Sequence, residues 1–234
     1  AGMVPAATGT QVRGSILRPA CYNGTWALKP SWGAINTRGG FPSPPSIGHL
    51  GFLAGSLADT WISCYWLSQN AGGDAGHPSL KGHPHLPKSQ KPKRLARVDT
   101  AGWADTSEPV REIFNEMVFK LERQGVEIVS RREDPELESY EQDMVQLSKV
   151  IEIVLAYEYR WPLMMYLDKN PELLGDRVFN RAKAAAEITP EQYEEALEWS
   201  ISARVRHEAL SSKYDAMLTL NGTGAAPEGM AIGN

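Results

Sequence analysis

A strand, a helix and a second strand follow one another over residues 95–129, and this order restricts the fold more than any other feature. Leu95–Val98 and Val126–Val129 are short apolar runs with the length and composition of strands. Between them, apolar residues recur at helical spacing over Val110–Leu121 and form one helix face. Because strands joined through a helix pair in parallel, we expect an α/β fold with a mixed, largely parallel sheet covered by helices.

Composition divides the chain into consecutive segments. The 234 residues suffice for one large domain, and we expect a single, partial one. Its segments are a Gly-, Pro- and Trp-rich core of low charge (1–69), an irregular connector (70–94), the strand–helix–strand unit (95–129), a mostly helical, acidic region (130–212), and a strand with a Gly/Pro loop (213–234).

Further elements are expected on both sides of this unit. A helix is predicted over about 57–69, and another begins at Thr189-Pro190, where a capping residue precedes a proline. Pro162 is expected to kink or end the long helix that contains it. Tyr214–Leu220 is predicted to be a returning strand.

Charge and hydropathy exclude several classes of partner. The net charge of -4 gives no electrostatic reason to expect nucleic acid or a membrane surface. The sequence holds no apolar run long enough for a transmembrane helix. Two cysteines make no disulfide framework, which favours a reducing, cytoplasmic location. The chain begins at Ala1 and ends in a Gly-rich loop, so we expect an internal piece of a longer protein.

The segment from Thr8 to Ala20, TGTQVRGSILRPA, is a glycine-rich loop that contains a serine. Successive backbone N–H groups of such a loop can stabilise a developing oxyanion, while the serine hydroxyl attacks a carbonyl. The loop has neither the Lys-Ser or Lys-Thr of a P-loop nor the G-x-S-x-G pattern of a nucleophile elbow. From these residues alone, a nucleophile and an ordinary turn both remain open.

The same segment resembles the signature of the amidase signature family, G-T-[DQ]-T-G-G-S-[IV]-[IR]-R-P-A followed by C-G-V-x-G-x-K-P-[ST]-x-G. The matching positions are Gly9, Thr10, Gln11, Gly14, Ser15, Arg18, Pro19 and Ala20, then Cys21, Gly24, Lys29, Pro30, Ser31 and Gly33. Two further segments resemble the family in the same order, Ser46–Gly51 with Ser56–Asp59, and Tyr214–Thr219 with Ala226-Pro227. The resemblance therefore extends over nearly the whole chain.

The resemblance implies an amidase that hydrolyses a carboxamide C–N bond through an acyl-enzyme, with no cofactor and no metal. Ser15 aligns with the nucleophile of a Ser–Ser–Lys triad, in which a second serine, preceded by a cis peptide bond, relays the proton to a lysine base. The other implied site residues are Val12, Arg13 and Gly14, whose N–H groups join that of Ser15 in an oxyanion hole, and Thr10 and Gln11, which support the loop.

The lysine and the second serine precede the signature in this family. Residues 1–11 supply neither, and Lys29 belongs to the Lys-Pro element that follows the nucleophile. We therefore expect residues 1–234 to be inactive alone. The alternatives are a non-catalytic relative that keeps the scaffold and an amidotransferase subunit. The expected partner is a small-molecule amide, and a homodimer of the full-length protein is left open.

Two positions depart from the commoner family pattern. Gln11 stands where an acid is usual, and Arg13 stands where Gly or Ala is usual. Arg13 is expected either to crowd the site or to bind an acidic substrate group. A Ser-His-Asp hydrolase is the rival chemistry, and it would need a histidine beside Ser15. The five histidines are instead interpreted as loop residues.

Overall fold

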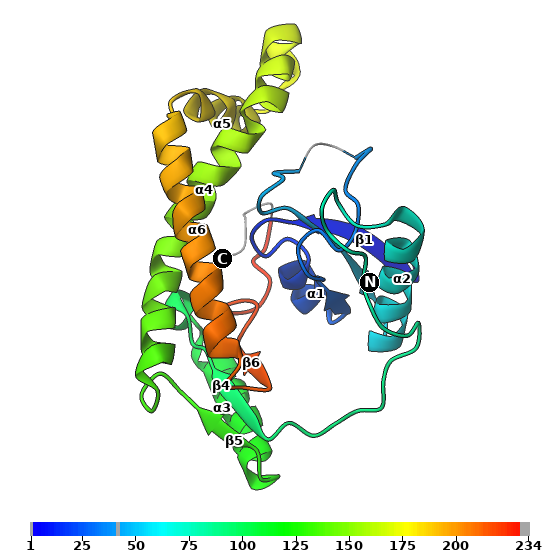
Figure 1. Cartoon of the computed structure of the whole chain (residues 1–234), viewed down its shortest axis with the longest axis vertical. Coiled ribbons are helices and arrows are strands. Elements are labelled where there is room, and N and C mark those ends of the chain that lie inside the picture. Colours follow the sequence, from blue (N-terminus) through cyan, green and yellow to red (C-terminus); the bar gives the residue numbers. More distant parts are fainter. Residues whose placement is uncertain (1, 41–42, 230–234) are drawn as a thin grey trace. The chain divides into compact units, whose positions relative to one another are not determined.

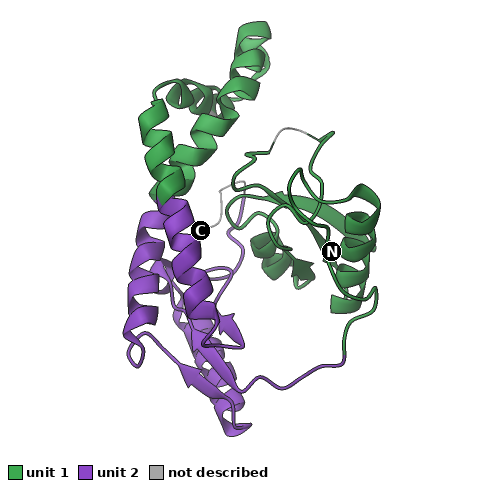
Figure 2. Ribbon diagram, viewed as in Figure 1, with its two compact units in different colours: residues 1–87, 149–198 green, residues 88–148, 199–234 purple. Residues whose placement is uncertain are grey.

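The computed structural model describes residues 2–40 and 43–229. The chain forms two compact units, and each unit combines two separate stretches of sequence (Figure 2). Unit 1 contains Ala1–Pro87 and Lys149–Glu198, and unit 2 contains Lys88–Ser148 and Trp199–Asn234. The subdivision into segments of one domain stays a prediction.

Figure 1 labels most of the helices and strands, which are numbered in chain order. Unit 1 contains β1 (Ala6–Gln11), α1 (Leu17–Asn23), β2 (Trp26–Leu28), β3 (His49–Ala54), α2 (Leu57–Ala71), the 3-10 turn η2 (Pro171–Leu173) and α5 (Asp176–Ala186). Unit 2 contains β4 (Arg94–Arg97), the 3-10 turn η1 (Ala101–Trp103), α3 (Glu108–Arg123), β5 (Glu127–Val129) and β6 (Ala216–Leu218). Two helices, α4 (Pro135–Lys169) and α6 (Pro190–Ser211), contribute residues to both units.

The sheet of unit 1 is antiparallel, with strand order β1-β3-β2. Gly9 of β1 lies directly opposite Gly51 of β3, so neither strand has a side chain at this point of the sheet. The Ile16 side chain, which is fully buried, occupies the space. A Cβ atom on Gly51 would lie 2.8 Å from Ile16 Cδ1 and would collide with the Leu28 carbonyl, whereas one on Gly9 would lie 3.4 Å from Ile16 Cγ1.

Helix α2 packs on this sheet and confirms the helix predicted over about 57–69. Ser56 caps it, because its Oγ accepts a hydrogen bond from Asp59 N at 3.0 Å. Cys64 of the helix joins Ile35 and Phe52 in a buried cluster. Burial raises the pKa of the Cys64 thiol to about 11, which keeps it protonated and unreactive.

The sheet of unit 2 is parallel, with strand order β5-β4-β6. It confirms the strand–helix–strand prediction, and Gly125, at a φ of 78°, ends α3 before β5. Strand β6 confirms the predicted returning strand. Leu137 of α4 and Leu210 of α6 pack on this sheet in one buried cluster with Ala96. The mixed α/β class is therefore confirmed, with the parallel strands confined to unit 2.

Of the two outcomes expected at Pro162, the end of the helix is excluded, because α4 continues to Lys169, and the kink stays a prediction. Proline removes one backbone hydrogen bond, but tertiary contacts hold the preceding turn. The Glu158 carboxylate accepts hydrogen bonds from Ser46 N at 3.0 Å and from the Tyr193 hydroxyl at 2.8 Å. The Tyr193 ring also stacks on Tyr157 at 4.1 Å.

The helix predicted from Thr189-Pro190 is confirmed as α6. Thr189 Oγ1 accepts from Gln192 N at 3.2 Å, and Gln192 Oε1 accepts from Thr189 N at 3.0 Å. This reciprocal pair is a capping box, which satisfies two backbone donors at the start of the helix. Over the described residues, every helix is too short or too polar to cross a bilayer.

Replacing Gly51 with alanine tests the packing of Ile16. We expect Gly51→Ala to lower the free energy of unfolding by about 1–3 kcal/mol, because the new methyl group collides with the Leu28 carbonyl and Ile16. Gly9→Ala is the matched control, since its Cβ makes only ordinary contacts, and it should stay within about 1 kcal/mol of the parent. Urea unfolding compares the two, and equal effects would contradict the packing described.

Replacing Tyr214 tests the hydrogen bond between its hydroxyl and Asp134 in unit 2. The Tyr214 hydroxyl donates to Asp134 Oδ2 at 2.6 Å, which lowers the pKa of Asp134, while burial and this carboxylate raise the pKa of Tyr214 to about 12. We expect Tyr214→Phe to lower the free energy of unfolding by about 1 kcal/mol at pH 7.

The pH dependence of this loss follows from the two pKa shifts. A lowered Asp134 pKa stabilises the fold above the unfolded value, so the difference between parent and variant should shrink as acid protonates Asp134. A raised Tyr214 pKa stabilises the fold below the unfolded value of about 10, so only the parent should lose this contribution between about pH 10 and 12. A difference independent of pH would refute the role of this hydrogen bond.

Candidate active site

Ser15 lies in the short loop that joins β1 to α1. Strand β1 ends at Gln11, helix α1 begins at Leu17, and Ser15 is exposed between them. Gly14 adopts a φ of 75°, a left-handed conformation that a residue with a side chain rarely takes. Its carbonyl accepts from Arg18 N at 2.8 Å, which closes the turn immediately around Ser15.

The Gln11 side chain holds this loop through two hydrogen bonds. It is buried, and its Oε1 accepts hydrogen bonds from Ile16 N at 2.7 Å and from Leu17 N at 3.0 Å. Both donors belong to the start of α1, where backbone N–H groups have no partner within a helix. One side chain therefore connects the end of the strand to the start of the helix across the residues that carry the signature.

The backbone N–H groups of the loop are the candidates for binding an oxyanion. Within the described residues, the amides of Val12, Gly14 and Ser15 donate no hydrogen bond. The Ser15 hydroxyl likewise has no hydrogen-bond partner among these residues. Backbone N–H groups without a partner next to an exposed hydroxyl are available to bind an anionic oxygen.

Thr10, the other residue predicted to support the loop, is exposed on β1 opposite Leu50. In the described chain its hydroxyl makes no hydrogen bond. The contacts that hold the loop come instead from Gln11 and from Ile16, which lies over Gly9 and Gly51. Sequence reasoning missed Ile16, although an apolar residue directly after the serine was visible in the signature.

Arg13 turns its side chain toward helix α4 of the same unit. Its Nη2 lies 2.8 Å from Glu152 Oε1, and both side chains are about half exposed. An exposed ion pair of this kind contributes at most about 1 kcal/mol, so it directs the side chain more than it stabilises the fold. No local pattern pointed to Glu152, which follows Arg13 by more than a hundred positions.

Lys29 follows β2 and is half-buried. Burial lowers the pKa of its ammonium group, and no described residue forms an ion pair with it. No lysine or serine side chain of the described residues hydrogen-bonds to Ser15. The proton acceptor that a serine nucleophile needs is therefore not among the hydrogen-bond partners of Ser15 in this part of the chain.

The histidines give no support to a Ser-His pair. The His77 ring packs against Trp32 at a centroid distance of 4.4 Å, and His83 Nδ1 accepts from His85 N at 3.2 Å. The interpretation of all five histidines as loop residues is wrong for two of them, because His49 begins β3 and His207 lies in α6. His49 Nδ1 lies 3.1 Å from the Ile47 carbonyl. The part of the chain that the structure describes also contains no group of three metal-ligating side chains.

The names of curated relatives describe the hydrolysis or the transfer of amides. Mandelamide hydrolase of Pseudomonas putida is 30% identical over 169 residues, which cover 72% of this chain and 29% of that protein. The A subunit of glutamyl-tRNA(Gln) amidotransferase from Sulfolobus acidocaldarius is 29% identical over 131 residues, which cover 54% of this chain and 28% of that protein. The chain thus spans less than a third of either relative.

Solved structures share the fold. A crystal structure of an amidase superposes with a TM-score of 0.74 at 23% identity, over 96% of this chain and 47% of that one. A bacterial aryl acylamidase superposes with a TM-score of 0.68 at 16% identity, over 93% and 46%. The chain spans about half the length of these structures.

The family model for amidases matches residues 1–221, which include the signature, both sheets and the helices of both units. The resemblance predicted from the signature residues is confirmed, and the chain belongs to the amidase family.

Proposed function

We propose that Ser15 is the nucleophile of an amidase that hydrolyses the C–N bond of a small-molecule carboxamide. The observation that carries the proposal is the exposed Ser15 hydroxyl beside three backbone amides that donate no hydrogen bond within the described residues. Gln11 and the buried Ile16 hold this loop in place. The named activities of the curated relatives support the same chemistry.

In the proposed reaction, one loop supplies both the nucleophile and the donors that bind the oxyanion. Ser15 Oγ loses its proton to a base and forms a bond to the amide carbon, which moves a negative charge onto the carbonyl oxygen. The N–H groups of Val12, Arg13, Gly14 and Ser15 stabilise that oxygen, and loss of one such donor typically slows the reaction about 10²–10³-fold. The C–N bond breaks, the amine leaves with a proton, and water hydrolyses the ester on Ser15.

The proton transfers need groups that residues 2–40 and 43–229 do not bring to Ser15 as hydrogen-bond partners. We propose that a lysine base and a second serine outside these residues complete the triad, as the family resemblance implies. Residues 1–234 alone are then inactive, because an unactivated serine hydroxyl is a weak nucleophile. A protein of this kind acts on a diffusible substrate, and we place it in the cytoplasm.

A fluorophosphonate probe tests the role of Ser15. We expect the probe to label Ser15 in a protein extended upstream to include the lysine and the second serine, and Ser15→Ala to abolish the labelling. Residues 1–234 alone should react at least about 10³-fold more slowly. Ser89→Ala, which removes an exposed serine of the connector, is the matched control and should leave labelling unchanged.

Mass spectrometry of the labelled peptide identifies the modified residue. Labelling at another serine, or full labelling of Ser15→Ala, would overturn the assignment of the nucleophile. An extended protein that is folded but never labelled would favour the alternative of a non-catalytic relative.

Substitution of Gln11 tests the support of the loop. Gln11→Met removes the acceptor of one buried and one partly buried N–H group, so we expect a loss of about 1–3 kcal/mol in the free energy of unfolding and slower acylation of Ser15. Gln11→Glu keeps an acceptor of equal length and should retain the stability of the parent near pH 7. Thermal unfolding and probe labelling measure the two effects, and equal behaviour of the variants would contradict this role.

A component of an amidotransferase is the second candidate, because several curated relatives are A subunits of glutamyl-tRNA(Gln) amidotransferase. Both candidates use the same acyl-enzyme, and they differ in the fate of the ammonia. Release of ammonia from mandelamide by the extended protein alone would favour the hydrolase. Release from glutamine only in the presence of a partner protein would favour the amidotransferase.

A further inference from the structure

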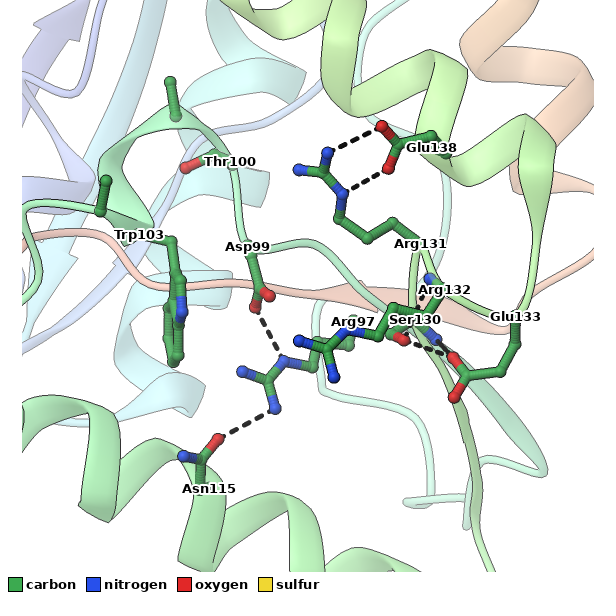
Figure 3. A pocket seen from close by; sticks show the side chains of 12 residues that line it. Arg97, Asp99, Thr100, Trp103, Asn115, Ser130, Arg131, Arg132, Glu133 and Glu138 are labelled. Atoms are coloured by element: carbon green, nitrogen blue, oxygen red, sulfur yellow. Dashed lines mark hydrogen bonds and ion pairs between the residues drawn. The ribbon is translucent and has the colours of Figure 1, made fainter.

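A cavity of about 920 Å³ opens in unit 2 at the carboxyl ends of the parallel strands β4 and β5 (Figure 3). Asp99 and Thr100 follow β4, and Arg131 and Arg132 follow β5, so two strand ends supply side chains to the same space. Ligands of open α/β sheets bind in crevices at this edge. The cavity lies within the size range of small-molecule sites.

All the carboxylates of the cavity are engaged by neighbouring donors. Asp99 Oδ1 accepts from Arg97 Nε at 2.7 Å, and Glu138 forms a two-pronged pair with Arg131, one contact of which measures 2.8 Å (Figure 3). Glu133 accepts from Ser130 N at 2.7 Å. Hydrogen bonds from Ser130 and Arg131 lower the pKa of Glu133 and Glu138, respectively, so both stay ionised at neutral pH.

Two donor groups of the cavity are unused. In the described chain the Arg132 guanidinium forms no hydrogen bond or ion pair, although its charge contributes to the lowered pKa of Glu133. Asn115 uses its carbonyl oxygen to accept from Arg97 Nη1 at 2.9 Å, and its NH₂ group has no partner among these residues. A guanidinium and an amide NH₂ group without acceptors favour an anionic ligand.

The backbone at the mouth of the cavity is strained. Thr100 adopts a φ of 58° and a ψ of 174°, a conformation that is nearly confined to glycine. Among the described residues, it is the only one other than glycine with a positive φ. The buried Glu141 carboxylate accepts from Thr100 N at 3.0 Å and holds this conformation. Strain of this kind is maintained by its surroundings and is concentrated at binding sites.

We propose that this cavity binds a small organic molecule with a single carboxylate, whose two oxygens pair with the Arg132 guanidinium. Of the three arginines in the lining, Arg132 alone has no anionic partner among the described residues, so the second charge of a dianion such as phosphate would stay unpaired. A monoanion needs only the unused donors, and the planar fork of Arg132 matches a carboxylate. Trp103 and Ala104 supply apolar surface for the organic part. The site is independent of the reaction at Ser15.

Calorimetric titration with sodium benzoate at pH 7 tests the proposal. We expect benzoate to bind, and Arg132→Gln to weaken its binding at least about tenfold, since a hydrogen-bonded charged partner is lost. Arg38→Gln, which removes an exposed charge from unit 1, is the matched control and should leave binding unchanged within about twofold. Circular dichroism confirms that each variant is folded.

Two further ligands define the chemistry of the site. Benzyl alcohol, which lacks the charge, and inorganic phosphate should each bind at least about tenfold more weakly than benzoate. The indole N–H signal of Trp103, assigned with Trp103→Phe, should shift only with benzoate. Absence of benzoate binding, equal affinity of Arg132→Gln and Arg38→Gln, or tighter binding of phosphate would overturn the proposal.

Discussion

The packing of one isoleucine on a pair of glycines underlies the arrangement around Ser15. Ile16 can be fully buried directly after an exposed serine because Gly9 and Gly51 face each other in adjacent strands and leave the sheet surface bare. Its backbone N–H is held by Gln11 at the same time, so one residue is fixed through both its side chain and its main chain. The exposure of Ser15 is thus a consequence of the burial of its neighbour.

The two units position their functional groups by different means. In unit 1 an antiparallel sheet supports a loop whose backbone carries the candidate chemistry. In unit 2 the parallel strands end at one edge, and long side chains such as Arg131 and Arg132 extend from there into a cavity. The first arrangement suits a reaction at a carbonyl carbon, and the second suits recognition of a charged group.

Local patterns predicted unit 2 well and unit 1 poorly. The apolar run of β4, the amphipathic face of α3 and Gly125 act within a few residues, so β5 and the parallel pairing followed from them. The strands β1, β2 and β3 were not predicted, because their glycines and exposed edges lack alternating hydrophobicity, and their pairing depends on contacts between distant residues. Arg13 illustrates the same limit, since its ion pair with Glu152 joins positions that no local pattern connects.

Gln11, the side chain that holds the Ser15 loop in place, is electrically neutral. Gln11 accepts both hydrogen bonds with an amide oxygen, whereas the acid commoner in related signatures would do so with a full negative charge. An amide does not titrate, so this support does not depend on acidity over the range in which a buried carboxylate would gain a proton. It also adds no negative potential close to the place where the reaction develops its own charge. The residue that holds the loop therefore brings no charge of its own to the chemical step.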